Sequence, residues 1–251
     1  MAEPIEALQL VDLLTSLLHR ALGDSVVGLY LHGSLTVGDF APDRSDIDLY
    51  LVLDRDPAVA DVEAVATVVG QAVEAYPAYD DRIEVEAFSA ATVRAGDPTD
   101  LPLLRVSPGE PCHLLPVTPH RILGWAGART DATALIGPAP VDVFPERSAD
   151  VTDEVVRGIV REWPVWVTED DRVGFNAYAV LTLCRCWCHL MLHERLSKLR
   201  AGLAYGGVSP DDAELTRWAI RWWYRGGQDD EPARTDEVRA FVNRICAELV
   251  S

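Results

Sequence analysis

Apolar and polar positions in the first half of the chain change from helical to extended spacing and back. Apolar residues three or four positions apart between Leu8 and Leu22 predict a helix over 5–22. Short apolar runs predict strands, and an alanine- and valine-rich stretch predicts a further helix. The strands are expected at 26–31, 46–53 and 82–89, and the helix at 58–75. This order of elements predicts a small α/β domain built on a mixed sheet.

The pattern of the second half is helical. Residues 90–117 contain five prolines and are expected to form a loop, followed by a helix over 118–128. Further helices are expected at 151–163, 172–193, 210–225 and 235–249, with breaks at Gly206-Gly207 and Gly226-Gly227. Six of the seven tryptophans also lie beyond residue 150. We therefore expect an α/β domain over 1–150 and an all-α, helical bundle domain over 151–251.

Composition and charge narrow the class of partner. The 251 residues are 49% hydrophobic and carry a formal net charge of −18. An acidic surface repels nucleic acid and attracts cations. The alternative explanation of the charge is that it only keeps the protein soluble. There is no apolar run of membrane-spanning length and no basic N-terminal signal, so we expect a cytoplasmic protein that binds neither membrane nor nucleic acid. A cationic small molecule is the favoured partner.

The cysteines and paired histidines resemble metal ligands but are expected to be structural. Cys184, Cys186 and Cys188 lie in an apolar helix, where residues two apart point in nearly opposite directions and cannot converge on one ion. We therefore expect them in the core, as small apolar residues in a reducing compartment. His189 and His193 lie one helical turn apart, but no third ligand is near them in the sequence.

Two carboxylates at the start of the second predicted strand are the main chemical signal. Asp46 and Asp48 are two residues apart, so in a strand they share one face. Adjacent carboxylates repel unless a cation lies between them, and Mg²⁺ suits a site that is shared with nucleotide phosphates. Gly33 allows close approach to a phosphate, and Ser34 adds a hydroxyl. The alternative is an ordinary turn followed by a capped strand.

A third carboxylate could come from the neighbouring predicted strand. Glu84 and Glu86 are also two residues apart and would share a face. Either could join the two aspartates or act as a general base. The residue pattern alone leaves the choice between them open.

Three stretches carry a resemblance to a known family. The run "HGS…SDIDLYLVL" resembles the signature of nucleotidyltransferases with the DNA polymerase beta fold. The stretches "ATALIGPAPVDVF", ending at residue 144, and "VLTLCRCW", 180–187, resemble aminoglycoside adenylyltransferases of the (3'')(9) class, which modify streptomycin and spectinomycin. The resemblance implies a polymerase-beta-like catalytic domain followed by a helical domain that binds the acceptor. It also implies ATP as co-substrate and a monomeric protein.

The resemblance assigns roles in the first domain. It implies that Gly33 and Ser34 hold the triphosphate, and that Asp46, Asp48 and Glu84 ligate magnesium, with two ions expected. Glu84 matches the family's catalytic glutamate better than Glu86 does, and would act as general base on the antibiotic hydroxyl.

In the second domain, the resemblance assigns Arg185 and Lys198 to the nucleotide, and Trp166 and Asp171 to the acceptor. Phe175 stands where an acidic ligand for the drug is expected, and a drug-flanking tryptophan has no counterpart between 90 and 117. Streptomycin is therefore favoured over spectinomycin. The alternatives are a nucleotidyltransferase that acts on another small metabolite or a protein side chain, and a non-catalytic, antitoxin-like protein of the same fold.

Overall fold

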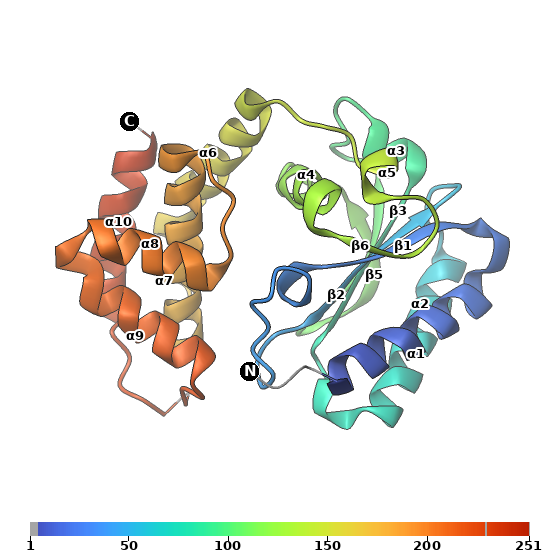
Figure 1. Ribbon diagram of the computed structural model, residues 1–251, viewed down its shortest axis with the longest axis horizontal. Helices are drawn as coiled ribbons and strands as arrows, with labels where there is room; N and C mark the ends of the chain where they lie inside the picture. The colour runs from blue at the N-terminus through green and yellow to red at the C-terminus, as the bar shows by residue number, and fades with distance from the viewer. Residues whose placement is uncertain (1–4, 229, 251) are drawn as a thin grey trace. The chain divides into compact units, whose positions relative to one another are not determined.

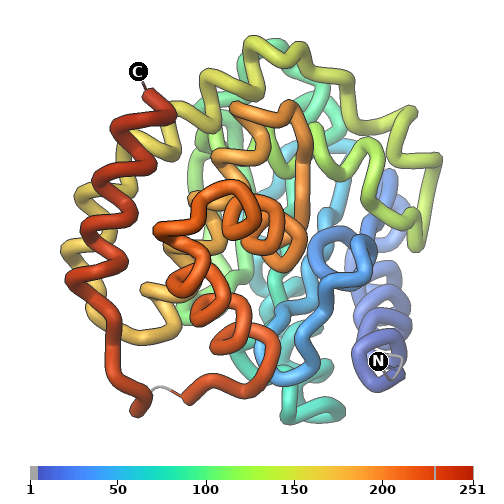
Figure 2. Tube along the Cα trace, turned by 60° about the vertical axis from the view of Figure 1, so that its left-hand side comes forward, coloured from blue at the N-terminus to red at the C-terminus, as the bar shows by residue number. Residues whose placement is uncertain are grey.

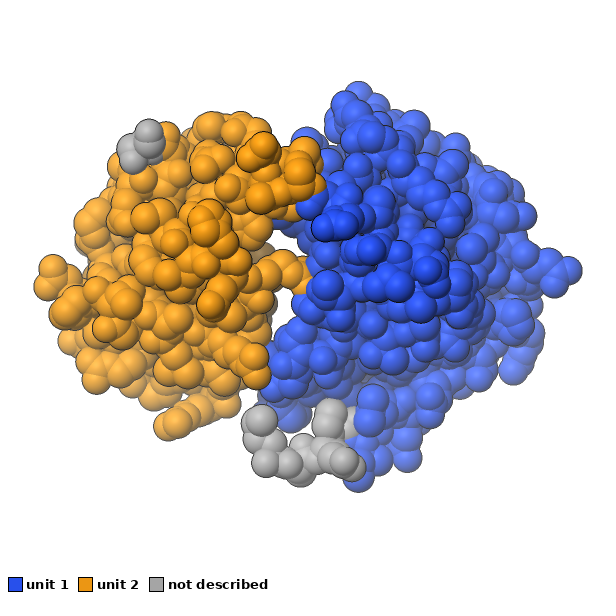
Figure 3. Space-filling view, turned by 45° about the horizontal axis from the view of Figure 1, so that its top comes forward, with its two compact units in different colours: residues 1–147 blue, residues 148–251 orange. Residues whose placement is uncertain are grey.

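The computed structural model describes residues 5–228 and 230–250. The chain forms two compact units, Met1–Arg147 and Ser148–Ser251, coloured blue and orange in Figure 3. Each unit has its own buried core, and they are described in turn.

The first unit is a six-stranded mixed sheet with helices on both faces (Figure 1). The strands are β1 (Val26–His32), β2 (Ile47–Leu53), β3 (Ile83–Ser89), β4 (Pro102–Ser107), β5 (Glu110–Pro116) and β6 (Thr133–Ile136). Their order across the sheet is β5-β4-β3-β2-β1-β6. The neighbours β2 and β3 are parallel, and every other pair is antiparallel. The predicted mixed-sheet α/β fold is therefore confirmed.

The two faces of the sheet bury different side chains. One face packs aliphatic residues such as Leu29, Leu49 and Leu51 against α1 (Ile5–Leu22) and α2 (Val59–Ala75), which lie side by side in Figure 1. The other face packs aromatic side chains, among them Tyr50 and Trp125. The helices of this aromatic face are α3 (Ala90–Arg94), α4 (His120–Asp131) and α5 (Pro140–Val143). The candidate site lies on this same face of the sheet, next to the aromatic side chains, where the strands carry polar residues instead.

The loop predicted over 90–117 was wrong, because this stretch holds α3 and the β4–β5 hairpin. The hairpin turns at Pro108-Gly109, where Gly109 has φ +75°, a conformation that glycine adopts without strain. The remaining prolines of the hairpin are tolerated because Pro102 begins β4 and the others lie in the edge strand β5. Proline content therefore indicated an edge hairpin rather than a loop.

The second unit is all helical, as predicted. Its main helices are α6 (Ala149–Trp166), α7 (Val173–Trp187), α8 (Lys198–Val208), α9 (Ala213–Tyr224) and α10 (Thr235–Val250). A π-helical turn, Cys188–Leu192, continues α7. The helix α10, red in Figure 2, packs along α6 and α7, while α8 and α9 pack on α7 and on each other.

The helix α8 was not predicted, and the expected break at Gly206-Gly207 was wrong. Both glycines lie in the last turn of α8. A Cβ at Gly206 would lie 2.5 Å from Thr216 Oγ1, and one at Gly202 would lie 3.0 Å from Ile220 and Leu181 side-chain atoms. These glycines therefore allow close helix packing and do not end the helix.

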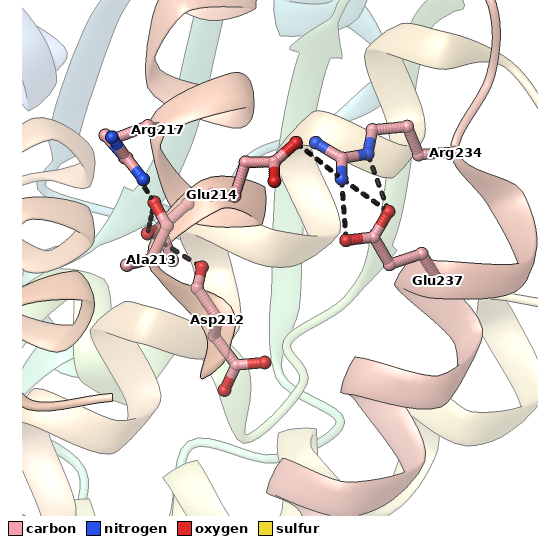
Figure 4. Close-up of polar contacts among 7 residues, drawn as sticks. Asp212, Ala213, Glu214, Arg217, Arg234 and Glu237 are labelled. Atoms are coloured by element: carbon pink, nitrogen blue, oxygen red, sulfur yellow. Dashed lines mark hydrogen bonds and ion pairs between the residues drawn. The ribbon is translucent and has the colours of Figure 1, made fainter. Parts of the chain in front are cut away.

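Polar contacts connect the last two helices to their surroundings. Arg234 donates to both carboxylate oxygens of Glu237, at 2.7 Å each, and to Glu214 of α9 at 3.3 Å (Figure 4). Arg217 Nε donates to the Ala213 carbonyl at 2.8 Å. The buried Asp212 carboxylate accepts from Tyr205 and is paired with Arg244 of α10. These contacts fix the start of α9 against α8 and α10.

The cysteines of α7 are core residues. Cys184, Cys186 and Cys188 are buried, and burial raises the pKa of each thiol. Raised pKa values keep these thiols protonated and unreactive at neutral pH.

In the part of the chain that the structure describes, no helix combines the length and the apolar character needed to cross a membrane.

Candidate active site

The candidate site is built on one row of residues across three adjacent strands. His32 of β1 is in register with Asp48 of β2, and Asp48 is in register with Glu84 of β3. Because β2 and β3 are parallel, Asp48 and Glu84 both lie near the beginning of their strands and on the same face of the sheet. Residues far apart in sequence are thus brought next to one another.

The turn after β1 presses its backbone against Asp48. Gly33 has φ +75°, and a Cβ built on it would overlap the Asp48 carboxylate and lie 2.8 Å from its Cγ. The turn is held by hydrogen bonds from Thr36 Oγ1 to the Gly33 carbonyl (3.0 Å) and from the Asp39 amide to the Ser34 carbonyl (2.9 Å). Glycine is required here both by conformation and by space.

The Ser34 side chain next to this turn has a buried hydroxyl. Its Oγ is buried and has no hydrogen-bond partner among the residues described. A buried hydroxyl without a partner is costly, so such atoms are commonly satisfied by a ligand or by water.

An arginine fixes the segment that leads into Asp46. Arg82, which immediately precedes β3, donates through Nη2 to the carbonyls of Pro42 (2.7 Å) and Ser45 (2.5 Å). The Ser45 hydroxyl accepts from the Ala41 amide at 2.9 Å, and the Ile47 amide donates to the Arg82 carbonyl. The approach to the two aspartates is therefore rigid.

Asp46 and Asp48 keep partial solvent access on either side of the fully buried Ile47. Asp48 lies in β2 and Asp46 immediately precedes it, so a common face for both carboxylates remains a prediction from their two-residue spacing. Glu84 is also partly exposed, whereas Glu86 is 1% exposed and lies deeper along β3. Exposure thus separates the two glutamates: Glu84 can reach a bound molecule, and Glu86 is enclosed by protein.

Glu86 is paired with Arg121, the second residue of α4, at 2.5 Å. Burial raises the pKa of Glu86 to about 7; Arg121 opposes this shift, and the nearby Glu84 adds to it. Burial also raises the pKa of Glu84, while Arg121 and Arg105 lower it. A carboxyl with a raised pKa is a stronger base than an ordinary glutamate, which suits proton removal from a hydroxyl.

Sequence reasoning missed the residues that support the row. Tyr50, in register with Glu86, is buried and stacks on His32 with ring centroids 3.7 Å apart. Burial raises its pKa well above the usual value, with Glu86 contributing. One indication of Arg121 was present in the sequence, since a glutamate in a buried strand requires a cationic partner and Arg121 lies in the helix predicted over 118–128.

The residues present fit magnesium that is shared with a nucleotide. Within the described residues, no three His, Cys, Asp or Glu side chains form a ready-made metal cage. Mg²⁺ usually takes one or two carboxylates and completes its shell with phosphates and water. Asp48 beside the Gly33 turn, with the neighbouring Asp46 and the Ser34 hydroxyl that has no partner among the described residues, would provide such a partial set.

In the second unit, Trp166 and Asp171 lie at and just after the end of α6. The partly buried Trp166 ring lies 5.5 Å from the Trp163 ring. Asp171 accepts from Arg239 of α10 at 2.7 Å, and its side chain is 70% exposed. Phe175 also packs on Trp163, at 5.8 Å. Both predicted acceptor residues are therefore accessible, next to an aromatic cluster.

Arg185 and Lys198, the predicted nucleotide residues of this unit, lie on α7 and at the start of α8. Arg185 lies on an exposed side of α7 and donates to the Leu196 carbonyl at 3.2 Å. The Lys198 ammonium lies over the rings of Trp223, at 4.1 Å, and Tyr178, at 5.0 Å.

Two comparisons with known proteins agree with this architecture. Residues 148–248 match the family model described as "Aminoglycoside adenylyltransferase, C-terminal domain". The fold is similar to that of a spectinomycin adenyltransferase, AAD(9), from Enterococcus faecialis, whose crystal structure contains ATP and spectinomycin. The TM-score is 0.77 at 14% identity, over 96% of this chain and 99% of that chain. No curated protein sequence matches the chain.

The chain has the two-unit fold of this adenyltransferase structure. Its second unit matches the aminoglycoside adenylyltransferase C-terminal domain over residues 148–248. The family resemblance drawn from the sequence, and with it the prediction of an adenylyltransferase-like enzyme, is confirmed.

Proposed function

We propose that the protein transfers AMP from ATP to a hydroxyl of an aminoglycoside in a magnesium-dependent reaction that releases pyrophosphate. We further propose that streptomycin is preferred to spectinomycin, and that the modification confers antibiotic resistance. The match of the second unit to an aminoglycoside adenylyltransferase domain supports the acceptor class. The streptomycin preference rests on Trp166 and Asp171, the residues that the family resemblance assigns to that drug.

The observation that carries the proposal is the row in which Asp48 lies between the Gly33 turn and Glu84. It brings together the Gly33 turn with the Ser34 hydroxyl, a carboxylate for a cation and a carboxylate for a proton. Adenylyl transfer requires all three, because the triphosphate must be held while the acceptor hydroxyl loses a proton.

In this mechanism the Gly33 turn and the Ser34 hydroxyl bind phosphate oxygens of ATP. Glu84 takes the proton of the acceptor hydroxyl. The hydroxyl oxygen attacks the α-phosphorus, and the bond from that phosphorus to the oxygen bridging the α- and β-phosphates breaks. The products are the adenylylated acceptor and pyrophosphate.

Asp46 and Asp48, together with Glu84, would hold magnesium when ATP is bound. The ion would supply charge stabilisation for the phosphate oxygens during transfer. The Glu86–Arg121 pair lies close enough to Glu84 for the Arg121 charge to lower the pKa that burial raises.

For the acceptor, Asp171 would pair with a guanidinium or ammonium group, and Trp166 would offer an aromatic face to a sugar ring. The exposure of the Asp171 side chain supports this role. An acidic chain of net charge −18 would also attract a polycation at low salt.

The test is pyrophosphate release with ATP and Mg²⁺, with streptomycin, spectinomycin or an uncharged sugar as acceptor, followed by mass spectrometry of the drug. We expect an AMP adduct on streptomycin, a slower reaction with spectinomycin and none with the sugar. Adduct on neither drug, with ATP binding retained by calorimetry, would overturn the aminoglycoside acceptor and favour another metabolite.

A further inference from the structure

The 167–172 loop joins α6 to α7 and carries Asp171, one of the two predicted acceptor residues. The other, Trp166, is the last residue of α6 and directly precedes the loop. The first part of the loop is folded by a local hydrogen bond from the Glu169 amide to the Trp166 carbonyl, at 3.0 Å. This local turn does not include Asp171, so the position of the aspartate depends on contacts from elsewhere.

Arg239 of α10 contacts both ends of the loop. Its Nε donates to the carbonyl of Val167, the first loop residue, at 3.3 Å, and its Nη2 donates to Asp171 Oδ1 at 2.7 Å. A guanidinium carries its donors in a rigid planar fork, so one arginine can hold two acceptors at a fixed separation. Arg239 therefore bridges the loop from one end to the other.

The helix α10 is a firm support for this bridge. It packs along α6 and α7, and Val238 and Val242, which flank Arg239 in the helix, are fully buried. One turn before Arg239, Thr235 Oγ1 accepts from Asn176 Nδ2 at 3.2 Å. Asn176 is buried and lies near the start of α7. The same side of α10 thus contacts the loop and the helix that follows it.

The exposure of the Arg239–Asp171 pair limits what it can contribute. The two side chains are 34% and 70% exposed, and ion pairs in contact with water add little to the free energy of unfolding. The two oxygens of a carboxylate can accept about four hydrogen bonds, so Asp171 can accept from Arg239 and from a ligand cation together. The pair therefore suits the positioning of a binding group better than the stabilisation of the fold.

We propose that Arg239 is a positioning residue for the acceptor: it holds the 167–172 loop, and with it the Asp171 carboxylate, in the conformation that binds a cationic group of the drug. This inference rests on the proposed function in taking Asp171 as a ligand of the acceptor. A carboxylate that is fixed beforehand loses less conformational entropy when the ligand binds. All the groups belong to the second unit, and the family resemblance assigned Arg239 no role.

The first test measures the order of the loop without drug or turnover. Hydrogen exchange followed by mass spectrometry reports on the backbone amides of 167–172. Arg239→Gln should raise the exchange rate of peptides that cover the loop severalfold, because both ends lose their contact with α10. The matched control is Arg234→Gln, which removes an arginine paired with Glu237 at the start of α10 and should leave these peptides at the wild-type rate.

The second test measures drug binding by calorimetry and steady-state kinetics. Arg239→Gln should weaken streptomycin binding and raise its KM about three- to tenfold, the range expected for one immobilised side chain, with kcat and the KM for ATP unchanged. Arg239→Lys keeps the charge but lacks the fork, so it should recover part of the affinity. Adding Arg239→Gln to Asp171→Ala should cause little further loss, because the arginine acts through the aspartate.

Two results would overturn the proposal. One is wild-type loop exchange or wild-type streptomycin affinity in folded Arg239→Gln. The other is tighter streptomycin binding in this variant, which would mean that the arginine competes with the drug for Asp171. Melting curves monitor folding, and Arg239→Lys, which should show a smaller change in the same direction, serves if Arg239→Gln unfolds.

The exchange measurement separates this proposal from the proposed function. A wild-type protein that binds no aminoglycoside would contradict the proposed function, while loop exchange in Arg239→Gln would still decide whether the arginine fixes the loop. Conversely, normal transfer to streptomycin by wild type, with unchanged exchange and affinity in Arg239→Gln, would contradict the positioning role alone.

Discussion

Gly33 and Asp48 are so close that the aspartate carboxylate occupies the place where a Gly33 side chain would begin. The two residues come from the end of β1 and the start of β2, which pair as antiparallel neighbours. One contact thus joins the proposed phosphate-binding turn to the proposed metal ligand.

The first prediction concerns Gly33→Ala. The new Cβ would overlap the Asp48 carboxylate, and a φ of +75° is unfavourable for alanine, so we expect transfer to fall at least about 100-fold with the fold retained. The matched control is Gly38→Ala, at φ +71° with nothing within 4 Å of its Cβ. It carries the same backbone strain without the overlap. Equal loss in both variants would show that backbone strain, and not the contact, matters.

The second prediction concerns the metal. Asp48→Asn should abolish transfer even at saturating Mg²⁺, because an amide is a poor substitute for a carboxylate beside a divalent ion. Asp43→Asn, an exposed change in the preceding loop, should leave the rate unaltered. Activity of Asp48→Asn within a few-fold of wild type in the pyrophosphate assay would contradict the two-carboxylate site.

The third prediction separates the two glutamates. Glu84→Gln should remove the chemical step while leaving ATP and acceptor binding measurable by calorimetry, because Glu84 is the accessible member of the pair. Glu86→Gln should retain transfer at a reduced rate, since Glu86 is buried against Arg121. An inactive Glu86→Gln with an active Glu84→Gln would reverse the assignment of the base.

The fourth prediction is a pH dependence of stability. The pKa of Glu86 is about 7 in the folded protein against an ordinary value of 4.5, so between these values the folded state binds more protons than the unfolded state. The contribution of Glu86 to the free energy of unfolding should therefore be present at low pH and be lost as pH rises through this window. Urea titrations in EDTA should show wild type losing stability relative to Glu86→Gln from pH 4.5 to 7. A constant difference across this window would contradict the raised pKa.

The fifth prediction concerns the acceptor. Asp171→Ala should weaken streptomycin binding by about 1–3 kcal/mol, the usual loss for a hydrogen bond to a charged group. Asp170→Ala provides a neighbouring control, because the Asp170 side chain is only 20% exposed and is paired with Arg172, whereas the Asp171 side chain, paired with Arg239, is 70% exposed. Calorimetry measures the binding of streptomycin and of spectinomycin to each of the two variants. Equal losses in the two variants would indicate a general charge effect rather than a specific contact.

Sequence periodicity predicted those elements whose pattern is local. The helix over 5–22 and the strands around Asp48 and Glu84 were found because their apolar spacing is regular. The β4–β5 hairpin was missed because its prolines were read without knowing that β5 is an edge strand. The helix α8 was missed because its glycines serve packing against α9, a contact that only the folded chain reveals.

The same distinction holds for the candidate site. Asp46 and Asp48 could be read as a pair because two-residue spacing fixes their common face. The partner of Glu86 is Arg121, which lies 35 positions later on another element, and no local pattern connects the two. The rings beside Lys198 come from α7 and α9 and are invisible to periodicity for the same reason.

The parallel pairing of β2 and β3 has a consequence for how the enzyme matures. Antiparallel neighbours such as β4 and β5 need only a tight turn, but parallel strands must wait for the whole α2 crossover between them. Closing that long loop costs entropy before its contacts form, so such pairings are intrinsically slow. Asp48 lies on β2 and Glu84 on β3, so the two carboxylates become neighbours only when these two strands have paired.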